Sequence, residues 1–246
     1  MTNANNIKKY DGVFEGGGVK GVAFVGAICR LEEEGYELNR CAGTSAGSII
    51  ASLLAVGYSG KELRELIVNT DYNKFLDKNI SIFDTGNILE KSSHAYNLFM
   101  DKGLYSGDYF EKWMYNHLKA KGKTKFKDVC INGESRLKIV AADVSTGTML
   151  ILPDNLKKYG IDPMEFEISK AVRMSMSIPF FFEPVKLKNN YIVDGGILSC
   201  YPIWIFDVEG TPKYPTFGFN LDEEVTNYTL QGRGSANISD KTHSKQ

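Results

Sequence analysis

The chain has 246 residues, of which 43% are apolar, 12% aromatic and 24% charged, a composition that excludes an intrinsically disordered protein. With 29 basic against 30 acidic side chains, the formal charge of −1 gives no general electrostatic argument for binding nucleic acid or anionic lipid. Its apolar runs stop near ten residues, short of the about 18 that a membrane-spanning helix needs, which excludes a membrane-embedded protein but not a surface-bound one.

The first residues and the cysteines bear on the compartment. The first twelve residues lack the apolar stretch of a secretory signal peptide, so we expect a cytoplasmic protein, with peripheral contact to membranes left open. The four cysteines are scattered and form no Cys-x-x-Cys pair, which predicts free thiols in a reducing environment. They are Cys29, Cys41, Cys130 and Cys200.

The first part of the chain alternates between the patterns of strands and helices, which is typical of a parallel α/β core. Apolar residues recur at helical spacing after Ser45, and Gly57 ends that pattern. The expected elements are a strand at Ile7–Phe14, a helix at Val19–Glu34, a strand at Tyr36–Ala42, a helix from Ser45 to Gly57 and a helix at Lys61–Asn69.

The second part is expected to be mostly helical with loops from Asp71 to Gly122, and to return to strands after that. The later expected elements are helices at Asp108–Ala120 and Glu165–Met174, and strands at Leu137–Ala142, Thr148–Leu152, Phe180–Val185, Tyr191–Val193 and Pro215–Leu221. Residues Thr226–Gln246 hold few apolar side chains and are expected to form a mobile tail, so residues 8–225 are predicted to form one domain.

A glycine-rich loop lies between the first strand and the first helix, at Gly16-Gly17-Gly18-Val19-Lys20-Gly21. Glycines let the backbone turn sharply and leave its N–H groups unobstructed, and the following helix points its positive end at the loop. This geometry suits a bound phosphate or a transient oxyanion, and a tight turn without a ligand is the simpler alternative. The loop also fits the weak dinucleotide fingerprint, but it lacks the Gly-Lys-Ser/Thr of a phosphate loop.

The second motif, Gly43-x-Ser45-x-Gly47, follows a strand and precedes an apolar helix, which is the context of a nucleophile elbow. A sharp turn there projects the Ser45 hydroxyl away from the backbone, and the small flanking residues prevent clashes. The alternative is that Ser45 only caps its helix.

A nucleophilic serine needs a base, and the histidines offer weak candidates. His243 lies in the polar tail, His117 falls on an apolar helix face where a packed role is favoured, and His94 has no supporting motif. This weakens a Ser–His–Asp triad without excluding it.

A carboxylate at a strand end is the other candidate base, and Asp194-Gly195-Gly196 supplies it, with a hairpin turn as the equally weighted alternative. Asp143 is the rival carboxylate, but it fits a turn between two strands better. Asp11, before the glycine loop, is predicted to be structural.

Together these motifs resemble the patatin-like phospholipase family, whose order they follow: Gly16–Gly21, Gly43–Gly47 and Asp194–Gly196. Weaker likeness lies in Asp143–Gly147 and in Ala171–Pro179, and the resemblance runs from about Tyr10 to Leu221. It implies an α/β fold with a three-layer core and a mostly parallel central sheet. Many members continue in helical or strand-like sequence where this chain has its polar tail.

The resemblance also implies a serine acyl hydrolase with a Ser–Asp dyad and no catalytic histidine, metal or cofactor. By that likeness Ser45 is the nucleophile and Asp194 is the base. The implied oxyanion hole is the loop of Gly16, Gly17, Gly18, Lys20 and Gly21, flanked by the elbow glycines Gly43 and Gly47 and by the base-motif glycines Gly195 and Gly196.

We therefore expect a lipid acyl hydrolase of the phospholipase A type, whose partners are phospholipid or other acyl-lipid substrates and membrane surfaces, not nucleic acid. A lysophospholipase, a neutral-lipid lipase or a general esterase with the same dyad is the alternative. Less favoured are a nucleotide- or phosphate-binding module, because no acidic residue clearly ends a second strand, and an inactive lipid-binding protein. Residues Phe180–Phe182 suit an acyl channel or a membrane-facing rim, but a buried strand is favoured there.

Overall fold

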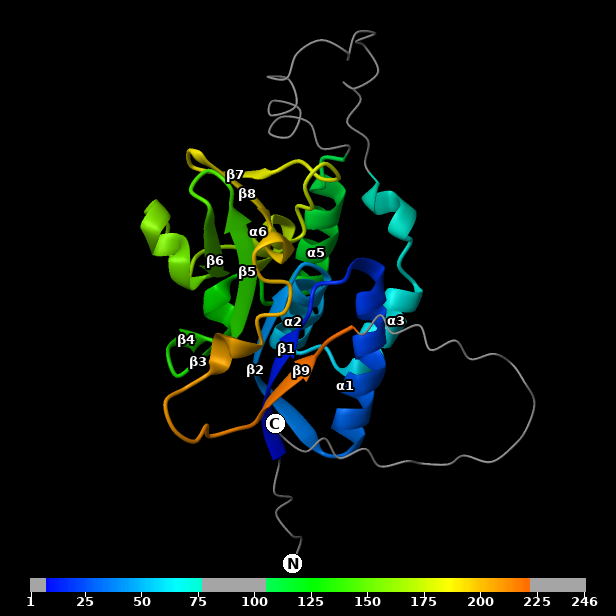
Figure 1. Cartoon of the computed structure of the whole chain (residues 1–246). Helices are drawn as coiled ribbons and strands as arrows, with labels where there is room; N and C mark the ends of the chain where they lie inside the picture. The colour runs from blue at the N-terminus through cyan, green and yellow to red at the C-terminus, as the bar shows by residue number, and fades with distance from the viewer. Residues whose placement is uncertain (1–7, 77–104, 222–246) are drawn as a thin grey trace, which may run out of the picture.

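The computed structural model describes residues 8–76 and 105–221, in which helices cover one face of a seven-stranded mixed sheet (Figure 1). Its strands follow the order β7-β8-β5-β2-β1-β9, with β6 paired to the remaining edge of β5. The strands are β1 Lys8–Phe14, β2 Tyr36–Thr44, β5 Leu137–Asp143, β6 Thr148–Leu152, β7 Val185–Leu187, β8 Asn190–Asp194 and β9 Thr216–Phe219. The short strands β3 Cys130–Ile131 and β4 Glu134–Ser135 form a separate pair.

The α-helices are α1 Ala23–Glu33, α2 Ala46–Val56, α3 Gly60–Val68, α5 Asp108–Ala120 and α6 Ile168–Ser175. Short 3-10 turns connect them: η1 Gly18–Val22, η2 Tyr72–Phe75, η4 Phe126–Val129, η5 Asp154–Tyr159, η6 Gly195–Ile197 and η7 Ile203–Phe206. The predicted α/β class with a mostly parallel centre is confirmed, since β9, β1, β2 and β5 run parallel to one another.

Strand β5 is the junction of the sheet, because three strands share its two edges. Strand β2 pairs with Leu137–Val140, β8 pairs antiparallel with Ala141–Asp143, and β6 pairs with Ile139–Asp143, overlapping both. Because β6 overlaps both partners, it occupies one edge, and β2 and β8 must share the other. Strands β2 and β8 run toward each other along that edge, and their last residues pair with the adjacent positions Val140 and Ala141 of β5.

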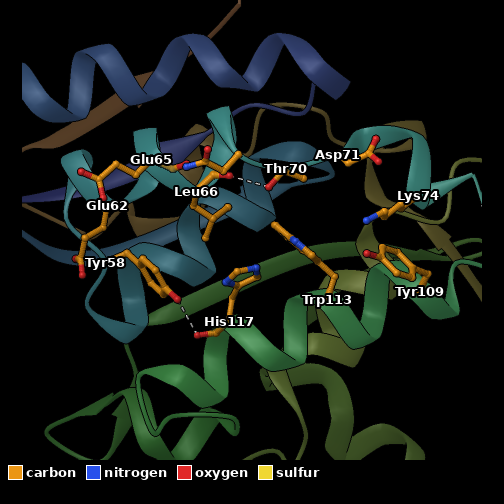
Figure 2. A pocket seen from close by; sticks show the side chains of 11 residues that line it. Tyr58, Glu62, Glu65, Leu66, Thr70, Asp71, Lys74, Tyr109, Trp113 and His117 are labelled. Carbon is orange, nitrogen blue, oxygen red and sulfur yellow. Dashed lines mark hydrogen bonds between the residues drawn. The ribbon is translucent and has the colours of Figure 1, made fainter.

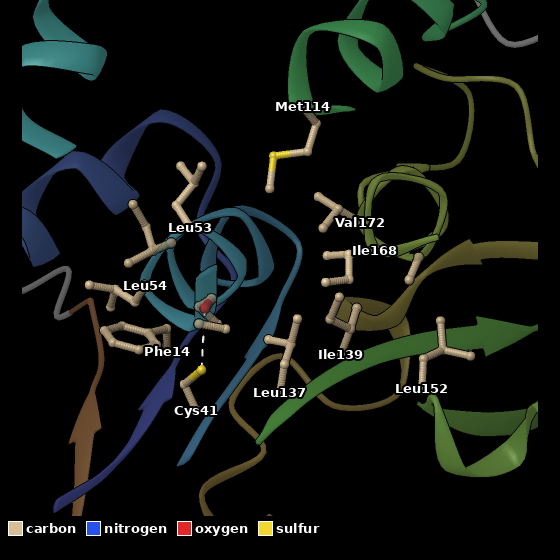
Figure 3. Packing of buried hydrophobic residues seen from close by; sticks show 14 of the residues in the cluster. Phe14, Cys41, Leu53, Leu54, Met114, Leu137, Ile139, Leu152, Ile168 and Val172 are labelled. Carbon is tan, nitrogen blue, oxygen red and sulfur yellow. Dashed lines mark hydrogen bonds between the residues drawn. The ribbon is translucent and has the colours of Figure 1, made fainter. Parts of the chain in front are cut away.

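The core forms around α2, which is buried on nearly every side (Figure 3). A helix without a polar face belongs in the interior, and α2 accordingly lies between the sheet and the other helices. The Cys41 thiol of β2 donates a hydrogen bond to the Ala51 carbonyl of α2 at 3.2 Å. A smaller cluster of Val13, Ala42 and Phe206 covers the opposite face, where the segment containing η7 packs.

Helix α2 ends at the predicted stop signal, and α3 begins at a capping box that was not predicted from the sequence. Gly57 ends α2 in the left-handed conformation, with a φ of 103°, which glycine adopts without strain. Ser59 then begins α3 through a capping box with Glu62, in which each side chain accepts the other residue's backbone N–H.

Three predicted elements differ from the structure. The helix predicted from Val19 begins only at Ala23, because η1 winds tightly enough to bring Gly21 against Ala46. The helix predicted from Glu165 begins at Ile168. The buried strand predicted from Phe180 is wrong: Phe180 has a φ of 67° and is 64% exposed, and regular pairing starts at Val185.

Of the remaining predictions, those on the cysteines and on membrane-spanning helices concern the described residues, and two others lie outside them. All four cysteines are free thiols, as predicted. Among residues 8–76 and 105–221, no helix is long and apolar enough to cross a bilayer. The predicted loops and helices between residues 77 and 104, and the predicted tail at 226–246, lie outside the described residues.

Asp11 has the structural role that its sequence position predicts. The register between β1 and β2 slips after Tyr10, so that Asn39 and Arg40 both face Asp11 in a β-bulge. The buried Asp11 carboxylate accepts hydrogen bonds from the Arg40 N–H at 3.0 Å, from the Asn39 amide at 2.9 Å and from the Arg40 guanidinium at 2.6 Å. The first of these bonds satisfies the Arg40 main-chain N–H, which the bulge would otherwise leave unpaired.

Asp11→Asn should therefore lower the free energy of unfolding by about 1–3 kcal/mol, the usual cost of leaving a buried donor unsatisfied. The matched control is Arg30→Ala, which removes the exposed pairs with Glu33 and Glu34 and should change stability by no more than about 0.5 kcal/mol. Urea unfolding measures both values. Equal effects of the two substitutions would contradict the assigned role of Asp11.

Candidate active site

Ser45 lies at the sharp turn between β2 and α2. It has a φ of 51° and a ψ of −126°, a conformation that costs a non-glycine residue about 1–3 kcal/mol. Its side chain makes no capping hydrogen bond to α2, so the interpretation of Ser45 as a mere helix cap is wrong. Its hydroxyl contacts the Met176 sulfur at 3.6 Å and also interacts with the Asp194 carboxylate.

The two elbow glycines are required by close backbone packing. A Cβ on Gly43 would lie 2.3 Å from the Gly47 carbonyl oxygen, and a Cβ on Gly47 would lie 2.2 Å from the carbonyl oxygen of Phe14. Both contacts are with main-chain atoms that cannot move aside. The elbow is therefore pressed against the end of β1, where the glycine loop starts.

Asp194 ends β8 opposite Ala141, while Thr44 ends β2 opposite Val140. The two strands that meet head to head on β5 thus bring Ser45 and Asp194 together. Gly195 allows this approach, because a Cβ there would lie 2.4 Å from the Val140 carbonyl oxygen. The chain after Asp194 enters η6, so the alternative of a hairpin turn at this motif is wrong.

The Asp194 carboxylate is buried and only half satisfied. Its Oδ1 accepts the Gly196 N–H at 2.6 Å, whereas Oδ2 has no hydrogen-bond partner among the described residues. Burial raises the pKa of Asp194 above its ordinary value, and interactions with the Ser45 hydroxyl and the Gly196 N–H offset part of that rise. A raised pKa makes this carboxylate a better proton acceptor than an exposed aspartate.

The glycine loop also lies against Ser45. A Cβ on Gly16 would lie 3.1 Å from the Ser45 Cβ, so only glycine fits there without displacing its neighbour. The Gly16 N–H donates to the Cys200 carbonyl at 2.9 Å, and this bond removes it from the set of free donors. Within residues 8–76 and 105–221, the N–H groups of Gly17 and Gly18 meet no acceptor.

The rest of the loop sets its shape. Gly18 has a φ of 57°, in the left-handed region that favours glycine. The Gly17 carbonyl accepts the Lys20 N–H at 3.2 Å, which closes the turn, and the Lys20 side chain is exposed. Gly21 is buried where η1 crosses α2, since its Cβ would lie 3.3 Å from that of Ala46.

The rival carboxylate, Asp143, is fully saturated. It accepts hydrogen bonds from the Tyr159 hydroxyl at 2.7 Å and the Asn190 amide at 2.6 Å, and from the N–H groups of Ser145 and Thr146. Burial alone would raise the pKa of Asp143, but these hydrogen bonds lower it overall. Asp143 thus holds a turn together, as its sequence context predicts.

Of the three histidines, His117 alone falls within the described residues. It lies on α5 with its ring against Trp113, at a centroid distance of 4.6 Å, and burial lowers its pKa. Both residues face a cavity of about 470 Å³ between α3 and α5, whose lining does not include Ser45 or Asp194 (Figure 2). The Tyr58 hydroxyl donates to the His117 carbonyl at 3.0 Å there, which fits a packing role.

Sequence reasoning missed the residues that support the site from α6. Met176 contacts the Ser45 hydroxyl, and the buried Ser175 hydroxyl accepts the Ser45 N–H at 2.8 Å. Their stretch carried only a weak family likeness and no assigned role. The contacts depend on the tertiary approach of α6 to β2, which no local spacing reveals.

Comparisons with known proteins place the chain in a family. The model of the family described as patatin-like phospholipase matches residues 12–207. The chain is 46% identical to the uncharacterized protein YqhO of Bacillus subtilis, over 86% of this chain and 70% of that protein. It is 26% identical to the "Probable lipid hydrolase 463L" of Invertebrate iridescent virus 6, over 78% of this chain and 61% of that protein.

Among solved structures, VipD from Legionella pneumophila superposes with a TM-score of 0.55 at 20% identity. The match covers 85% of this chain and 49% of the VipD chain, so this chain spans about half of that protein. At this identity the likeness concerns the fold. The family match and the identity to YqhO show that the chain belongs to the patatin-like phospholipase family.

Proposed function

We propose that this protein is a serine acyl hydrolase that cleaves fatty-acyl esters of phospholipids, in the manner of a phospholipase A, through a Ser45–Asp194 dyad. The observation that carries the proposal is the pairing of a strained, uncapped serine with a buried carboxylate whose Oδ2 has no partner among the described residues. The family and the viral relative named as a probable lipid hydrolase support lipid hydrolysis.

The chemistry proceeds in two acyl transfers. As Ser45 Oγ attacks the ester carbonyl carbon, Asp194 accepts the hydroxyl proton and then returns it to the departing alcohol, which leaves an acyl-Ser45. Water attacks the same carbonyl carbon while Asp194 takes a proton from the water. Asp194 then returns this proton to Ser45 Oγ as the acyl–oxygen bond breaks, which releases the fatty acid and restores Ser45. No histidine is needed in either step.

The negative oxygen that forms in each step needs donors, and the glycine loop supplies them. The Ser45 N–H is bound to Ser175 and the Gly16 N–H to Cys200, so within the glycine loop the N–H groups of Gly17 and Gly18 are the proposed donors of the oxyanion hole. Loss of one such donor typically lowers the rate by about 10²–10³.

A small apolar cavity of about 60 Å³ beside the glycine loop supports binding of a short apolar part of the substrate. It is bounded by η1 and α2 on one side and by α3, η2 and α5 on the other. Its lining side chains are almost all apolar, and the deepest of them, Leu53, is fully buried. Residues that line it include Gly18, Val22, Ile49, Leu53, Ile67 and Phe75.

Exposed apolar side chains on the segments that build the site support contact with a lipid surface. Val19 lies within the glycine loop and is 75% exposed, and Ile197 and Leu198 follow Gly196 of the Asp194 motif and are each 51% exposed. Phe180, which follows α6, is likewise exposed. Such side chains suit insertion at a lipid interface, where burial offsets the cost of exposing them to water.

The proposed function predicts defined products. Incubation with mixed phospholipid, lysophospholipid and triacylglycerol should release free fatty acid and lysophospholipid, detected by mass spectrometry, and Ser45→Ala should abolish the release. The fully buried Ser175 serves as the matched labelling control, because an organophosphorus probe should modify Ser45 and not Ser175. Intact, folded protein that releases no fatty acid and takes no label would contradict the proposal.

Asp194→Asn and Asp143→Asn should have opposite effects. Because burial raises the folded pKa of Asp194, its charged form costs stability above that pKa, so Asp194→Asn should unfold at equal or higher temperature near pH 7. Its turnover should fall by about 10²–10⁴, the contribution of a general base.

The folded pKa of Asp143 is lowered, so its contribution to stability is present above the unfolded pKa of about 3.9 and is lost as pH falls through the folded value. Asp143→Asn should therefore lose about 1–3 kcal/mol near neutral pH and progressively less as the pH falls below about 3.9, with turnover per folded molecule retained. Thermal unfolding across pH and steady-state assays measure both variants. If Asp143→Asn loses turnover and Asp194→Asn retains it, the assignment of Asp194 as the base is wrong.

The acyl cavity predicts a change in chain-length preference. Ile67→Trp fills the cavity and should lower the ratio of long-chain to short-chain ester turnover by at least about tenfold, a typical effect of steric change in an apolar pocket. Val68→Trp, on the neighbouring position that is 75% exposed, is the matched control and should leave the ratio unchanged. An unchanged ratio in Ile67→Trp would show that the acyl chain binds elsewhere.

A further inference from the structure

Three consecutive residues at the end of α6 contact both members of the proposed dyad. Ser175 binds the Ser45 backbone, Met176 contacts the Ser45 hydroxyl, and the Ser177 carbonyl accepts the Asp194 N–H at 2.9 Å. Neither Ser175 nor Ser177 is exposed, so their contribution to the site is through position rather than through contact with solvent or substrate.

Ser175 fills the gap where one strand pairing ends and the next begins. Its hydroxyl accepts the Ser45 N–H at 2.8 Å and donates to the Val140 carbonyl at 2.6 Å. Ser45 is the first residue after β2 and Val140 is the last residue of β5 that pairs with β2. The hydroxyl therefore replaces the direct main-chain bond that the ladder would make there if β2 continued.

The turn at Ser45 is what prevents β2 from continuing. The positive φ directs the chain after Ser45 away from β5, and the Ser45 N–H binds the Ser175 hydroxyl instead of a main-chain carbonyl. Without that hydroxyl, a buried N–H at the start of the turn would lack an acceptor, which would favour relaxation of the turn. The Ser175 hydroxyl therefore stabilises the conformation that directs the Ser45 side chain out of the strand.

The carbonyl of Ser45 is held in the same way. It accepts the Ser48 N–H at 2.8 Å and the Ser48 hydroxyl at 2.6 Å. Both main-chain polar groups of Ser45 are thus fixed by serines of other positions, while its own hydroxyl is left to react. Ser48 lies within α2 and moves with the elbow, whereas Ser175 connects the elbow to β5, the strand with which β8 pairs up to Asp194.

We propose that Ser175 is a positioning residue of the acyl-transfer reaction: its hydroxyl fixes the Ser45 backbone to β5, at the place where Asp194 arrives on β8. This inference rests on the proposed function, because it assigns a role within the same dyad. Ser175 forms no bond to the substrate. Its loss lets the nucleophile drift from the carboxylate and the oxyanion donors, and misplacement of about 1 Å can lower a rate by about 10²-fold.

The test compares two buried serines of the same helix. Ser169 is also buried, but its hydroxyl has no hydrogen-bond partner among the described residues, so Ser169→Ala is the matched control. Ser175→Ala should lower kcat on a soluble short-chain ester by about 10–100-fold, with KM within about twofold of wild type. Ser169→Ala should match wild type in both constants.

A second variant separates position from packing. Ser175→Thr keeps the hydroxyl but adds a methyl group to a fully buried site, so it should lose stability while retaining more of kcat than Ser175→Ala. Fluorophosphonate labelling of Ser45, expressed per folded molecule, should follow the same order. A purely structural role of Ser175 would instead make loss of kcat follow loss of stability, and that result would overturn the inference.

Hydrogen exchange of the Ser45 amide gives a readout that does not depend on turnover. In selectively ¹⁵N-serine-labelled protein, the Ser45 N–H should exchange slowly in wild type and in Ser169→Ala, and much faster in Ser175→Ala. If wild type hydrolyses no ester and takes no label, the proposed function fails. If wild type is active and Ser175→Ala matches it in kcat and amide exchange, the proposed function stands and the positioning role is wrong.

Discussion

The meeting of β2 and β8 on one edge of β5 is the constraint on which the site depends. Thr44 faces Val140 and Asp194 faces Ala141, so two strands that approach from opposite directions end at neighbouring positions. Ser45 then leaves the sheet into α2 and the chain after Asp194 leaves it through Gly195, whose lack of a side chain permits contact with Val140. Main-chain pairing, rather than any contact between the two side chains, sets the distance between Ser45 and Asp194.

The two buried aspartates of this region show how the same side chain serves stability or chemistry. Asp143 receives hydrogen bonds from four neighbouring groups, which lower its pKa and tie β5 to β8 and to η5. Asp194 receives one from Gly196, its Oδ2 has no hydrogen-bond partner in the described part of the chain, and burial raises its pKa. The fold stabilises the charged form of the first and leaves the second prepared to take up a proton.

The elbow, the glycine loop and helix α2 could be predicted from the sequence because glycines occupy the positions where the backbone turns or packs closely. Gly43 and Gly47 permit the elbow, Gly18 supplies a left-handed turn, and the apolar run after Ser45 gives the buried helix α2. The role of Ser175 could not be predicted, since it depends on how α6 packs against β5. The aromatic run at Phe180 has the propensity of a strand, but the positive φ of Phe180 turns the chain outward, an effect of tertiary context that propensity does not contain.

The segment after Asp194 is joined to both of the other parts of the site. The Thr44 hydroxyl donates to the Ser199 carbonyl at 3.0 Å, and Gly16 and Cys200 exchange two hydrogen bonds, from the Gly16 N–H to the Cys200 carbonyl and from the Cys200 thiol to the Gly16 carbonyl. A shift of residues 199–200 therefore moves the end of β2 and the start of the glycine loop together. The free energies of substitutions in these three segments will not add, and their evolution is coupled: a change in one restricts which changes the other two accept.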